Sequence, residues 1–517
     1  MKELKFLLFW CAFFLTGMQL NAQDFDVEKE TTFSSTQVNN IDGATWCSAI
    51  ATDDDGSIYW GYLSPGNEPN INMMIKKHDA STGLVSTHTI LENISKDNNH
   101  AEVSIGIDNN GYIHVIGGQH NNAPNYYRSA NPKDITSWVF KGDDDLNNGG
   151  LEGEHITYQH FFRSNNGTLF CAYRERLTNK WTQGEPAIMM ARYNTSNQNW
   201  TMLGGQNFKY TDSGCNELRG GIEVNKTPLI WDDSGIGGYP DCAYPCDRNT
   251  AYQGYKLKVV FDKNNVMHVT WNLGKNYYTT ANPAERHTHI LYAKSPDEGN
   301  TWYRADGSQI STLPITCETG NSDQDGDVVF VRYPDKWPLG CENTSTQETI
   351  GNESYIFMDS YNQPVIECRP RDLDRVYMRW NGSTWEDATT TFSDLAEGTS
   401  NLYSNHDGYI FKLRSDVVYI SKDNWTNVYQ FNLTDATVDW NIFEDPYYLA
   451  STGKLRYYSH DQSTHQAQVI TLSITEGVEP PPPPVTETIW LEAECGNVGS
   501  NWEEHNDANA SNGKYMK

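Results

Sequence analysis

Alternating apolar and polar residues recur along this chain directly after short polar turns. Each repeat begins with Asn, Asp or Gly residues, which favour a tight turn, and continues with a short strand pattern. Seven such stretches begin at Asp53, Asp108, Ser164, Asp262, Asp359, His406 and Thr452. They are about 45 to about 100 residues apart, and no helical periodicity is sustained between them. Repeated hairpins at this spacing predict an all-β fold, a seven-bladed β-propeller, with a large sandwich or a β-helix as alternatives.

One segment strengthens the propeller prediction. The stretch Ser295-Pro-Asp297-Glu-Gly299-Asn-Thr301-Trp302 fits the Asp-box pattern S-x-D-x-G-x-T-W. In such a turn the aspartate accepts hydrogen bonds from backbone amides and the tryptophan packs beneath it. We interpret this stretch as a structural element of a blade and not as a catalytic motif.

The N-terminus has the pattern of an export signal. A basic start precedes an apolar run from Phe6 to Leu15, and Leu20-Asn21-Ala22 resembles a cleavage site. We predict a signal peptide at residues 1–22 and a secreted, cell-surface or periplasmic protein. A membrane anchor is the alternative, but the apolar run is too short to span a bilayer.

The C-terminal region differs from the repeats. We expect the catalytic propeller to span residues 23–477, because five consecutive prolines mark a stiff linker at residues 478–488. Residues 489–517 resemble the opening of a family 6-like carbohydrate-binding β-sandwich, through Glu492-Ala493-Glu494 and Ala510-Ser511-Asn512-Gly513. Since about thirty residues cannot bury a core alone, we predict the truncated start of such a module.

Charge narrows the classes of partner. The formal net charge of the 517 residues is −29, which argues against nucleic acid and anionic membranes. A polyanionic substrate would require a cleft that concentrates the few arginines of the chain.

Two successive hairpins carry candidate chemistry at their open ends. His100 and His120 lie equally far from Asn110 in one turn, and Tyr158 and Arg174 lie equally far from Asn166 in the next turn. Residues equidistant from a turn face each other in an antiparallel hairpin. We therefore predict two cross-strand pairs, which neighbouring blades would bring together on one face of the propeller.

These four residue types suit one kind of reaction. Arginine can hold a carboxylate through two hydrogen bonds, and histidine or a cation-assisted tyrosine can transfer a proton. The combination fits β-elimination at a uronic acid, whereas no carboxylate pair of glycosidase type stands beside it. Taken singly, each of these residues is more often a surface or packing residue of a strand.

Three stretches resemble a BNR-repeat family of secreted bacterial propeller proteins that includes ulvan lyases of polysaccharide lyase families 24 and 25. They are NGYIHVIGGQHNNAPNYYRSANPKDITSW, EHITYQHFFRSNNGTLFCAYRER and MHVTWNLGKNYYTTANPAERHTHILYAKSPDEGNTW. The resemblance implies a seven-bladed propeller that cleaves ulvan, a sulfated algal polysaccharide, by β-elimination next to glucuronate or iduronate.

The same resemblance implies roles for individual residues. His100 and His120 match the catalytic histidine pair, Tyr158 matches the catalytic tyrosine, and Arg174 matches the arginine that neutralises the carboxylate. Tyr158 would be the principal acid/base with His100 sharing proton transfer, and Arg174 and His120 would polarise the carboxylate. Further substrate-binding candidates are Tyr252, Arg128 and His289.

The resemblance also implies that a metal ion could be held away from the chemistry. Cys242, Cys246 and His268 are the candidates for a structural zinc or calcium site, and no cofactor is expected to be required for the reaction. A Cys-x3-Cys spacing is a weak zinc pattern on its own. Cysteines of an exported protein favour disulfides, which are the alternative here.

We expect a monomeric enzyme whose partner is an anionic, sulfated polysaccharide, with neither nucleic acid nor membrane bound. Two other functions are open. The Asp-box also allows a sialidase-like glycoside hydrolase, although no arginine triad is evident in the sequence. The third reading is a non-catalytic propeller that binds glycans.

Overall fold

The chain forms two compact units in a computed structural model, one spanning Val27–Ile474 and one made of Met1–Asp26 and Thr475–Lys517. The structure describes residues 25–35, 47–67, 69–95, 102–142, 146–176, 186–205, 226–231, 252–279, 282–316, 323, 325–331, 354–370, 374–392, 402–414, 417–432, 441–461, 466–476, 504–506 and 514–516. The predicted signal peptide at 1–22 and linker at 478–488 lie outside these ranges, as do His100, Cys242 and Cys246. No helix within them is long and apolar enough to cross a membrane.

In the smaller unit the described residues form β31 (Glu504–Asn506) and β32 (Lys514–Met516), which pair antiparallel. These two short strands do not test the prediction of a carbohydrate-binding module at residues 489–517, which stays a prediction.

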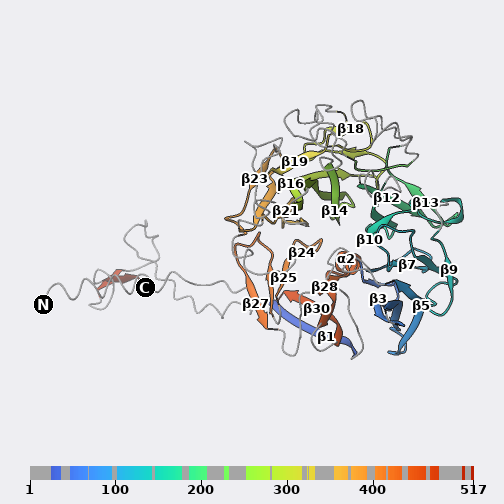
Figure 1. Cartoon of the computed structure of the whole chain (residues 1–517). Helices are drawn as coiled ribbons and strands as arrows, with labels where there is room; N and C mark the ends of the chain where they lie inside the picture. The colour runs from blue at the N-terminus through green and yellow to red at the C-terminus, as the bar shows by residue number, and fades with distance from the viewer. Residues whose placement is uncertain are drawn as a thin grey trace. The chain divides into compact units, whose positions relative to one another are not determined.

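The larger unit is a ring of seven antiparallel sheets (Figure 1), which confirms the predicted seven-bladed β-propeller. Blade 1 holds β2 (Ile50–Thr52), β3 (Ile58–Pro65), β4 (Asn70–His78) and β5 (Val85–Ser95), and blade 2 holds β6 (Val103–Ile107), β7 (Ile113–Gly117), β8 (Tyr126–Ser129) and β9 (Trp138–Phe140). Blade 3 holds β10 (Ile156–Arg163), β11 (Leu169–Arg176), β12 (Pro186–Asn194) and β13 (Asn199–Met202). Blade 4 holds β14 (Tyr252–Phe261), β15 (Met267–Thr279), β16 (Asn282–Ser295), β17 (Trp302–Tyr303), β18 (Gln309–Ile310) and β19 (Asp327–Val331).

The remaining blades follow the same order. Blade 5 holds β20 (Tyr355–Met358), β21 (Pro364–Cys368), β22 (Val376–Trp380) and β23 (Trp385–Asp387), and blade 6 holds β24 (Leu402–Ser404), β25 (Ile410–Arg414), β26 (Val417–Ser421) and β27 (Tyr429–Asn432). Blade 7 holds β28 (Asn441–Glu444), β29 (Leu455–Asp461), β30 (Gln466–Glu476) and β1 (Phe25–Ser35).

Blade 7 closes the ring with strands from two distant parts of the sequence. The strand β1 lies at the edge of this sheet next to β30, so the blue N-terminal strand and the red C-terminal strands are neighbours in Figure 1. Closure of this kind stabilises the ring, because the first and last blades cannot separate without breaking a ladder of hydrogen bonds within one sheet.

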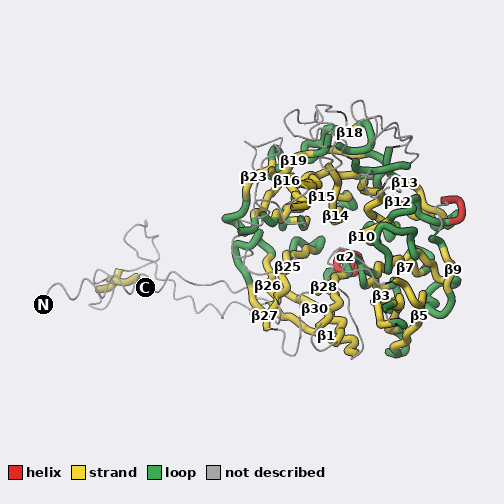
Figure 2. The backbone as a smooth tube through the Cα atoms, in the orientation of Figure 1, coloured by secondary structure: helices red, strands yellow, loops and turns green. Residues whose placement is uncertain are grey.

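Helices are few in the described part of the chain, as Figure 2 shows. The short 3-10 helix η1 (Leu146–Asn148) lies between blades 2 and 3, and α2 (Pro446–Thr452) follows β28 near the middle of the ring. Asp445 caps α2 by accepting a hydrogen bond from the backbone N–H of Tyr448, and Gly453 ends the helix with a φ of 71°.

In blades 1 to 6 a tight turn joins the first two strands, whereas in blade 7 the helix α2 lies between β28 and β29. The turns of blades 2, 4, 5 and 6 repeat one local arrangement. Asp108 shows it: its Oδ1 accepts hydrogen bonds from the backbone N–H of Asn110 at 2.8 Å and of Tyr112 at 3.0 Å. The turn residues Asp262, Asp359 and Asn405 do the same in their blades. We name the face that carries these turns the turn end and the opposite face of the ring the site end.

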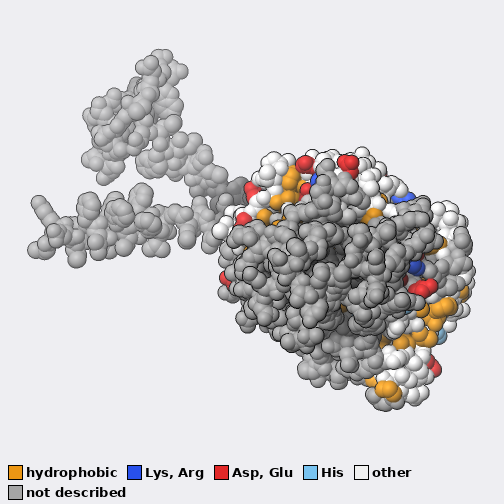
Figure 3. Space-filling view, turned by 45° about the horizontal axis from the view of Figure 1, so that its top comes forward, with side chains coloured by type: hydrophobic (Ala, Val, Ile, Leu, Met, Phe, Trp, Pro, Cys, Tyr) orange, Lys and Arg blue, Asp and Glu red, His pale blue; other side chains and the backbone are white. Residues whose placement is uncertain are grey.

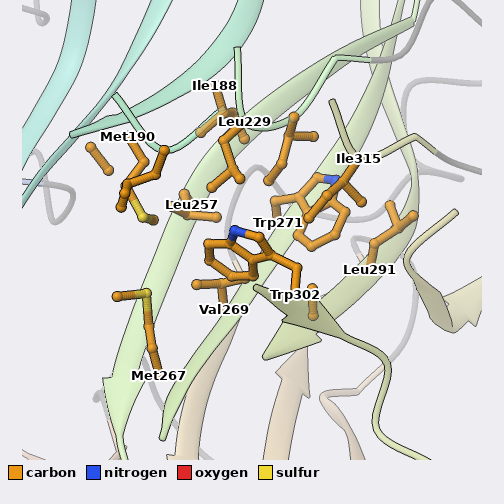
Figure 4. Packing of buried hydrophobic residues seen from close by; sticks show 14 of the residues in the cluster. Ile188, Met190, Leu229, Leu257, Met267, Val269, Trp271, Leu291, Trp302 and Ile315 are labelled. Atoms are coloured by element: carbon orange, nitrogen blue, oxygen red, sulfur yellow. The ribbon is translucent and has the colours of Figure 1, made fainter. Parts of the chain in front are cut away.

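Apolar side chains fill the spaces between neighbouring blades. In the cluster between blades 3 and 4, Trp271 from β15 and Trp302 from β17 pack with Ile188 of β12 and Leu257 of β14 (Figure 4). Trp302 ends the predicted Asp-box, and Asp297 in that turn accepts a hydrogen bond from the backbone N–H of Thr301 at 2.8 Å. The structural role that the sequence predicts for this motif is confirmed.

Candidate active site

The hairpin of blade 2 has the register that the sequence predicts. Val103 faces Gly117 and Ile107 faces Ile113, so the hairpin is centred on position 110. His120 follows β7 and is half-buried, whereas His100 is not described. The backbone N–H of Asn121 bonds to the hydroxyl of Thr157 at 3.0 Å, which brings the segment after β7 beside the start of β10.

The hairpin of blade 3 departs from its predicted register at the site end. Near the turn, His160 faces Ala172, but at the other end Thr157 faces Arg174. Two residues of β10, Tyr158 and Gln159, therefore lie opposite one residue of β11, which defines a β-bulge. Tyr158 and Arg174 are near neighbours across the hairpin, as predicted, but the bulge shifts their register by one residue from the count made from the turn.

The bulge nevertheless brings the two side chains together. Tyr158 adopts a φ of 57°, a left-handed conformation that costs a bulky residue about 1 kcal/mol or more. In this conformation its ring centroid lies 4.5 Å from the guanidinium carbon of Arg174. Both side chains are buried, with 6% and 8% of their surface exposed. The predicted contact of Tyr158 and Arg174 is thus present, through a geometry that the sequence did not indicate.

Blade 4 repeats the same bulge with different residues. Tyr255 faces Asn272 and Lys258 faces Thr270, so Lys256 and Leu257 lie opposite a single residue of β15. Lys256 has a φ of 46°, which makes it the counterpart of Tyr158. Leu257 points into the core between the blades (Figure 4), while the Nζ of Lys256 lies 5.7 Å from the Tyr158 ring centroid.

The two bulges assemble a compact group of four side chains. The hydroxyls of Tyr158 and Tyr255 share a hydrogen bond at 2.6 Å. The guanidinium carbon of Arg174 also lies 5.1 Å from the ring centroid of Tyr255, and the Nζ of Lys256 lies 5.5 Å from the same centroid. We name Tyr158, Tyr255, Arg174 and Lys256 the tyrosine–cation cluster. Two cations beside a pair of phenols favour negative charge at this position, whether on a phenolate or on a bound carboxylate.

A buried carboxylate supports the approach to β10. Glu175, the residue after Arg174, is 1% exposed and accepts hydrogen bonds from the backbone N–H groups of Glu154 and His155 at 3.0 and 3.2 Å. Gly153 precedes these residues with a φ of 154°, and a Cβ at this glycine would lie 2.7 Å from Glu175 Oε2. The chain that leads into the bulge is therefore fixed against the strand that carries Arg174.

Tyr255 and Lys256 were not among the residues predicted from the sequence. A signal for Lys256 was present, because it lies eight residues before Asn264 in its turn, as Tyr158 lies eight residues before Asn166. The backbone of Tyr252, the tyrosine that was predicted, pairs with Lys275. The side chain of Tyr252 is outside the described part, so its role stays a prediction.

Two other predicted substrate-binding residues lie in buried surroundings. Arg128 on β8 donates to the hydroxyl of Tyr193 at 2.9 Å and to Oε1 of Gln198 at 2.8 Å, so it joins blades 2 and 3. His289 on β16 has no exposed surface, and burial lowers its pKa to about 4. Substrate binding by Arg128 or His289 stays a prediction.

His268, the third candidate metal ligand, is buried at the turn end of blade 4. Its Nδ1 shares a hydrogen bond with the Tyr292 hydroxyl at 2.6 Å, and its Nε2 lies 3.7 Å from Asp262 Oδ2. His114 in blade 2 has the same surroundings, with the Tyr126 hydroxyl at 2.6 Å and Asp108 Oδ2 at 3.4 Å. The Nδ1 hydrogen bond thus belongs to a repeated turn-end arrangement, and metal binding by His268 stays a prediction.

The described residues contain no group of three or more histidine, cysteine, aspartate or glutamate side chains arranged to hold a metal ion. Cys242 and Cys246 lie outside them, so a zinc or calcium site at these two cysteines stays a prediction.

Several solved structures resemble this chain. The crystal structure of polysaccharide lyase Uly1 aligns with a TM-score of 0.52 at 14% identity over 82% of this chain and 89% of that chain. An α-L-arabinanase of Penicillium chrysogenum with arabinobiose aligns at 11% identity over 86% of this chain and 97% of its own, but with a TM-score of 0.36. At 14% identity the likeness to Uly1 concerns the fold alone.

No protein of curated function matches the chain. The model of the BNR repeat-containing family matches residues 57–393, a range that includes the hairpins of blades 2 to 5 and the whole tyrosine–cation cluster. The chain belongs to the BNR repeat-containing family.

Proposed function

We propose that this protein is an exported polysaccharide lyase that cleaves a sulfated, uronate-containing polymer of the ulvan type by β-elimination. The observation that carries the proposal is the tyrosine–cation cluster. It combines two hydrogen-bonded phenols with two cations in a largely buried position at the site end.

The reaction requires three functions. A base removes the proton on C5 of the uronate, and the electron pair of that bond forms the C4=C5 double bond. The C4–O bond breaks at the same time, and an acid delivers a proton to the departing glycosidic oxygen. A cation at the carboxylate makes the C5 proton easier to remove, because it stabilises the negative charge that develops there.

In the proposed mechanism Arg174 neutralises the carboxylate through its planar pair of N–H groups. Tyr158 transfers the proton, and the hydrogen bond to Tyr255 stabilises Tyr158 when it is ionised. Lys256 adds a second positive charge beside both rings. His120, whose segment is anchored to Thr157, assists at the carboxylate, and His100 shares proton transfer as the family resemblance implies.

The types of side chain in the tyrosine–cation cluster favour a lyase over a hydrolase. Glycoside hydrolysis commonly uses two carboxyl groups that flank the scissile bond, whereas the cluster consists of phenols and cations. The fold shared with polysaccharide lyase Uly1 is in accord with a lyase but does not decide the substrate. A protein that binds glycans without cleaving them is the alternative that the experiment must exclude.

The test is incubation with ulvan while the ultraviolet absorbance of the unsaturated uronate product is followed. A rise in absorbance identifies elimination. New reducing ends without a rise would identify hydrolysis, and retained binding without either would identify a binding protein.

The variants Tyr158→Phe and Arg174→Ala test the site itself. Each should lower kcat/KM by about a thousandfold, because each removes a group that acts in the transition state. Circular dichroism should show an unchanged β-sheet spectrum. Turnover close to that of the wild type in both variants would contradict the assignment of the site.

A further inference from the structure

Blade 5 continues the row of tyrosines that begins in blades 3 and 4. Tyr355 is the first residue of β20, just as Tyr158 and Tyr255 lie near the beginnings of β10 and β14. The first strands of blades 4 and 5 are in contact. Three adjacent blades thus each place a tyrosine at the site end, close to the central axis.

Tyr355 also carries cations on its ring. The guanidinium carbon of Arg369 lies 4.3 Å from the ring centroid, and the Nζ of Lys258 lies 5.0 Å from it. The pairing of an aromatic ring with two cations therefore recurs next to the tyrosine–cation cluster, on the following blade.

Arg369 is held in a fixed orientation and is still reachable from solvent. Its Nε lies 2.5 Å from Oε1 of Glu367, a residue with no exposed surface. Arg375 contacts the same oxygen at 2.9 Å, so two arginines share one carboxylate and the group has an excess of positive charge. The Arg369 side chain is 22% exposed.

This concentration of cations contrasts with the rest of the chain. The formal net charge is −29, with 38 lysines and arginines against 67 acidic residues. On the face shown in Figure 3, the described acidic and basic side chains are scattered near the rim. By contrast, five cationic side chains lie at the site end of blades 3 to 5. They are Arg174, Lys256, Lys258, Arg369 and Arg375.

We propose that Arg369, held against Tyr355 by Glu367, is a second anion-binding site for the same polymer. It takes a sulfate ester or a second carboxylate on a sugar next to the uronate that is bound at the tyrosine–cation cluster. The inference rests on the proposed function in that it assigns both sites to one substrate chain. A guanidinium suits either anion, because its planar fork can donate two parallel hydrogen bonds, and its fixed orientation lowers the entropic cost of binding.

The test compares Arg369→Met with the wild type on native ulvan and on chemically desulfated ulvan. KM and kcat are measured by the absorbance of the unsaturated product, and binding is measured separately by affinity electrophoresis. For native ulvan, KM and the dissociation constant should each rise by about tenfold, while kcat stays within about twofold, because Arg369 lies outside the group assigned to proton transfer.

Arg379→Met is a closely matched control on the same blade. The Arg379 side chain is 23% exposed, its Nε lies 2.7 Å from buried Asp359, and its guanidinium lies 5.6 Å from the Tyr361 ring centroid. It lies at the turn end, because Asp359 belongs to the turn between β20 and β21. This variant loses the same kind of contacts and should bind both polymers as the wild type does.

The outcomes separate the sources of the anion. A loss of affinity in Arg369→Met that is confined to native ulvan identifies sulfate, and an equal loss on both polymers identifies a second carboxylate. Unchanged affinity in Arg369→Met, or an equal loss in Arg379→Met, would overturn the proposal. If the wild type binds ulvan but forms no unsaturated product, the proposed function fails while the binding comparison still decides the role of Arg369.

Discussion

The two ends of the propeller follow different rules. At the turn end, four blades repeat one arrangement, in which an Asp or Asn side chain accepts two backbone N–H groups within five residues of sequence. At the site end, blades 3 and 4 share a bulge but present Tyr158 in one and Lys256 in the other. The comparison shows that the repeated end maintains the fold, whereas the variable end is where neighbouring blades combine different chemistry.

The largest expected effect that sharpens this comparison is that of Lys256→Met. This change keeps most of the unbranched side chain and removes its charge, so a phenolate in the tyrosine–cation cluster loses one of two neighbouring cations. We expect kcat/KM to fall by about a hundredfold. The acidic limb of the profile of kcat/KM against pH should move to higher pH, because loss of the cation makes ionisation of the phenol harder. The measurement is the pH profile of elimination, in which Lys256→Arg should restore most of the activity.

A matched control for this variant lies in blade 1. Lys76 is 7% exposed, compared with 5% for Lys256, and its Nζ lies 5.5 Å from the Tyr62 ring centroid. Lys76→Met should leave the pH profile unchanged. If Lys256→Met had the profile of the wild type, the repeated bulge would have no role in the reaction.

The turn end should respond in stability instead of activity. Asp108 is 2% exposed and accepts two backbone N–H groups, so Asp108→Ala leaves both without this partner. We expect the free energy of unfolding to fall by about 2 kcal/mol, as measured by urea denaturation, with kcat unchanged at a temperature where the variant is folded. A large loss of kcat in the folded variant would show that the two ends are coupled.

Asp134→Ala provides the comparison for Asp108. Asp134 accepts a hydrogen bond from the backbone N–H of Thr136 at 2.8 Å, but it is only half-buried. Water can replace the lost bond there, so the fall in stability should be clearly smaller than in Asp108→Ala.

The last expected effect concerns the pH dependence of stability. Burial lowers the pKa of His289 to about 4 from its ordinary value of 6.5, so the unfolded chain takes up a proton at pH values where the folded protein does not. The stability that the neutral ring provides is complete above pH 6.5 and is lost as the pH falls toward 4, by up to about 1.4 kcal/mol per pH unit. His289→Gln should reduce this slope in urea unfolding between pH 7 and pH 5. Identical slopes in variant and wild type would show that His289 does not contribute.

Prediction from the sequence succeeded where the structural signal is local. The Asp-box ending at Trp302 and the register of the blade 2 hairpin depend on a few neighbouring residues and are confirmed. The pairing of Tyr158 with Arg174 was shifted by one residue, because a bulge inserts a residue without changing the turn. Tyr255 was missed because its contact with Tyr158 joins residues 97 positions apart.

The sequence by itself determined the number of blades, the positions of the first six turns and the strands on which Tyr158 and Arg174 lie, but not the helix α2 in the seventh blade. These features follow from alternation and turn chemistry, which act over a few residues. Only the tertiary structure decided that Tyr255 and Lys256 complete the cluster and that His268 belongs to the turn end. The physical reason is that side chains from different blades meet through the packing of the ring, and a single left-handed residue in each bulge redirects the side chain that takes part.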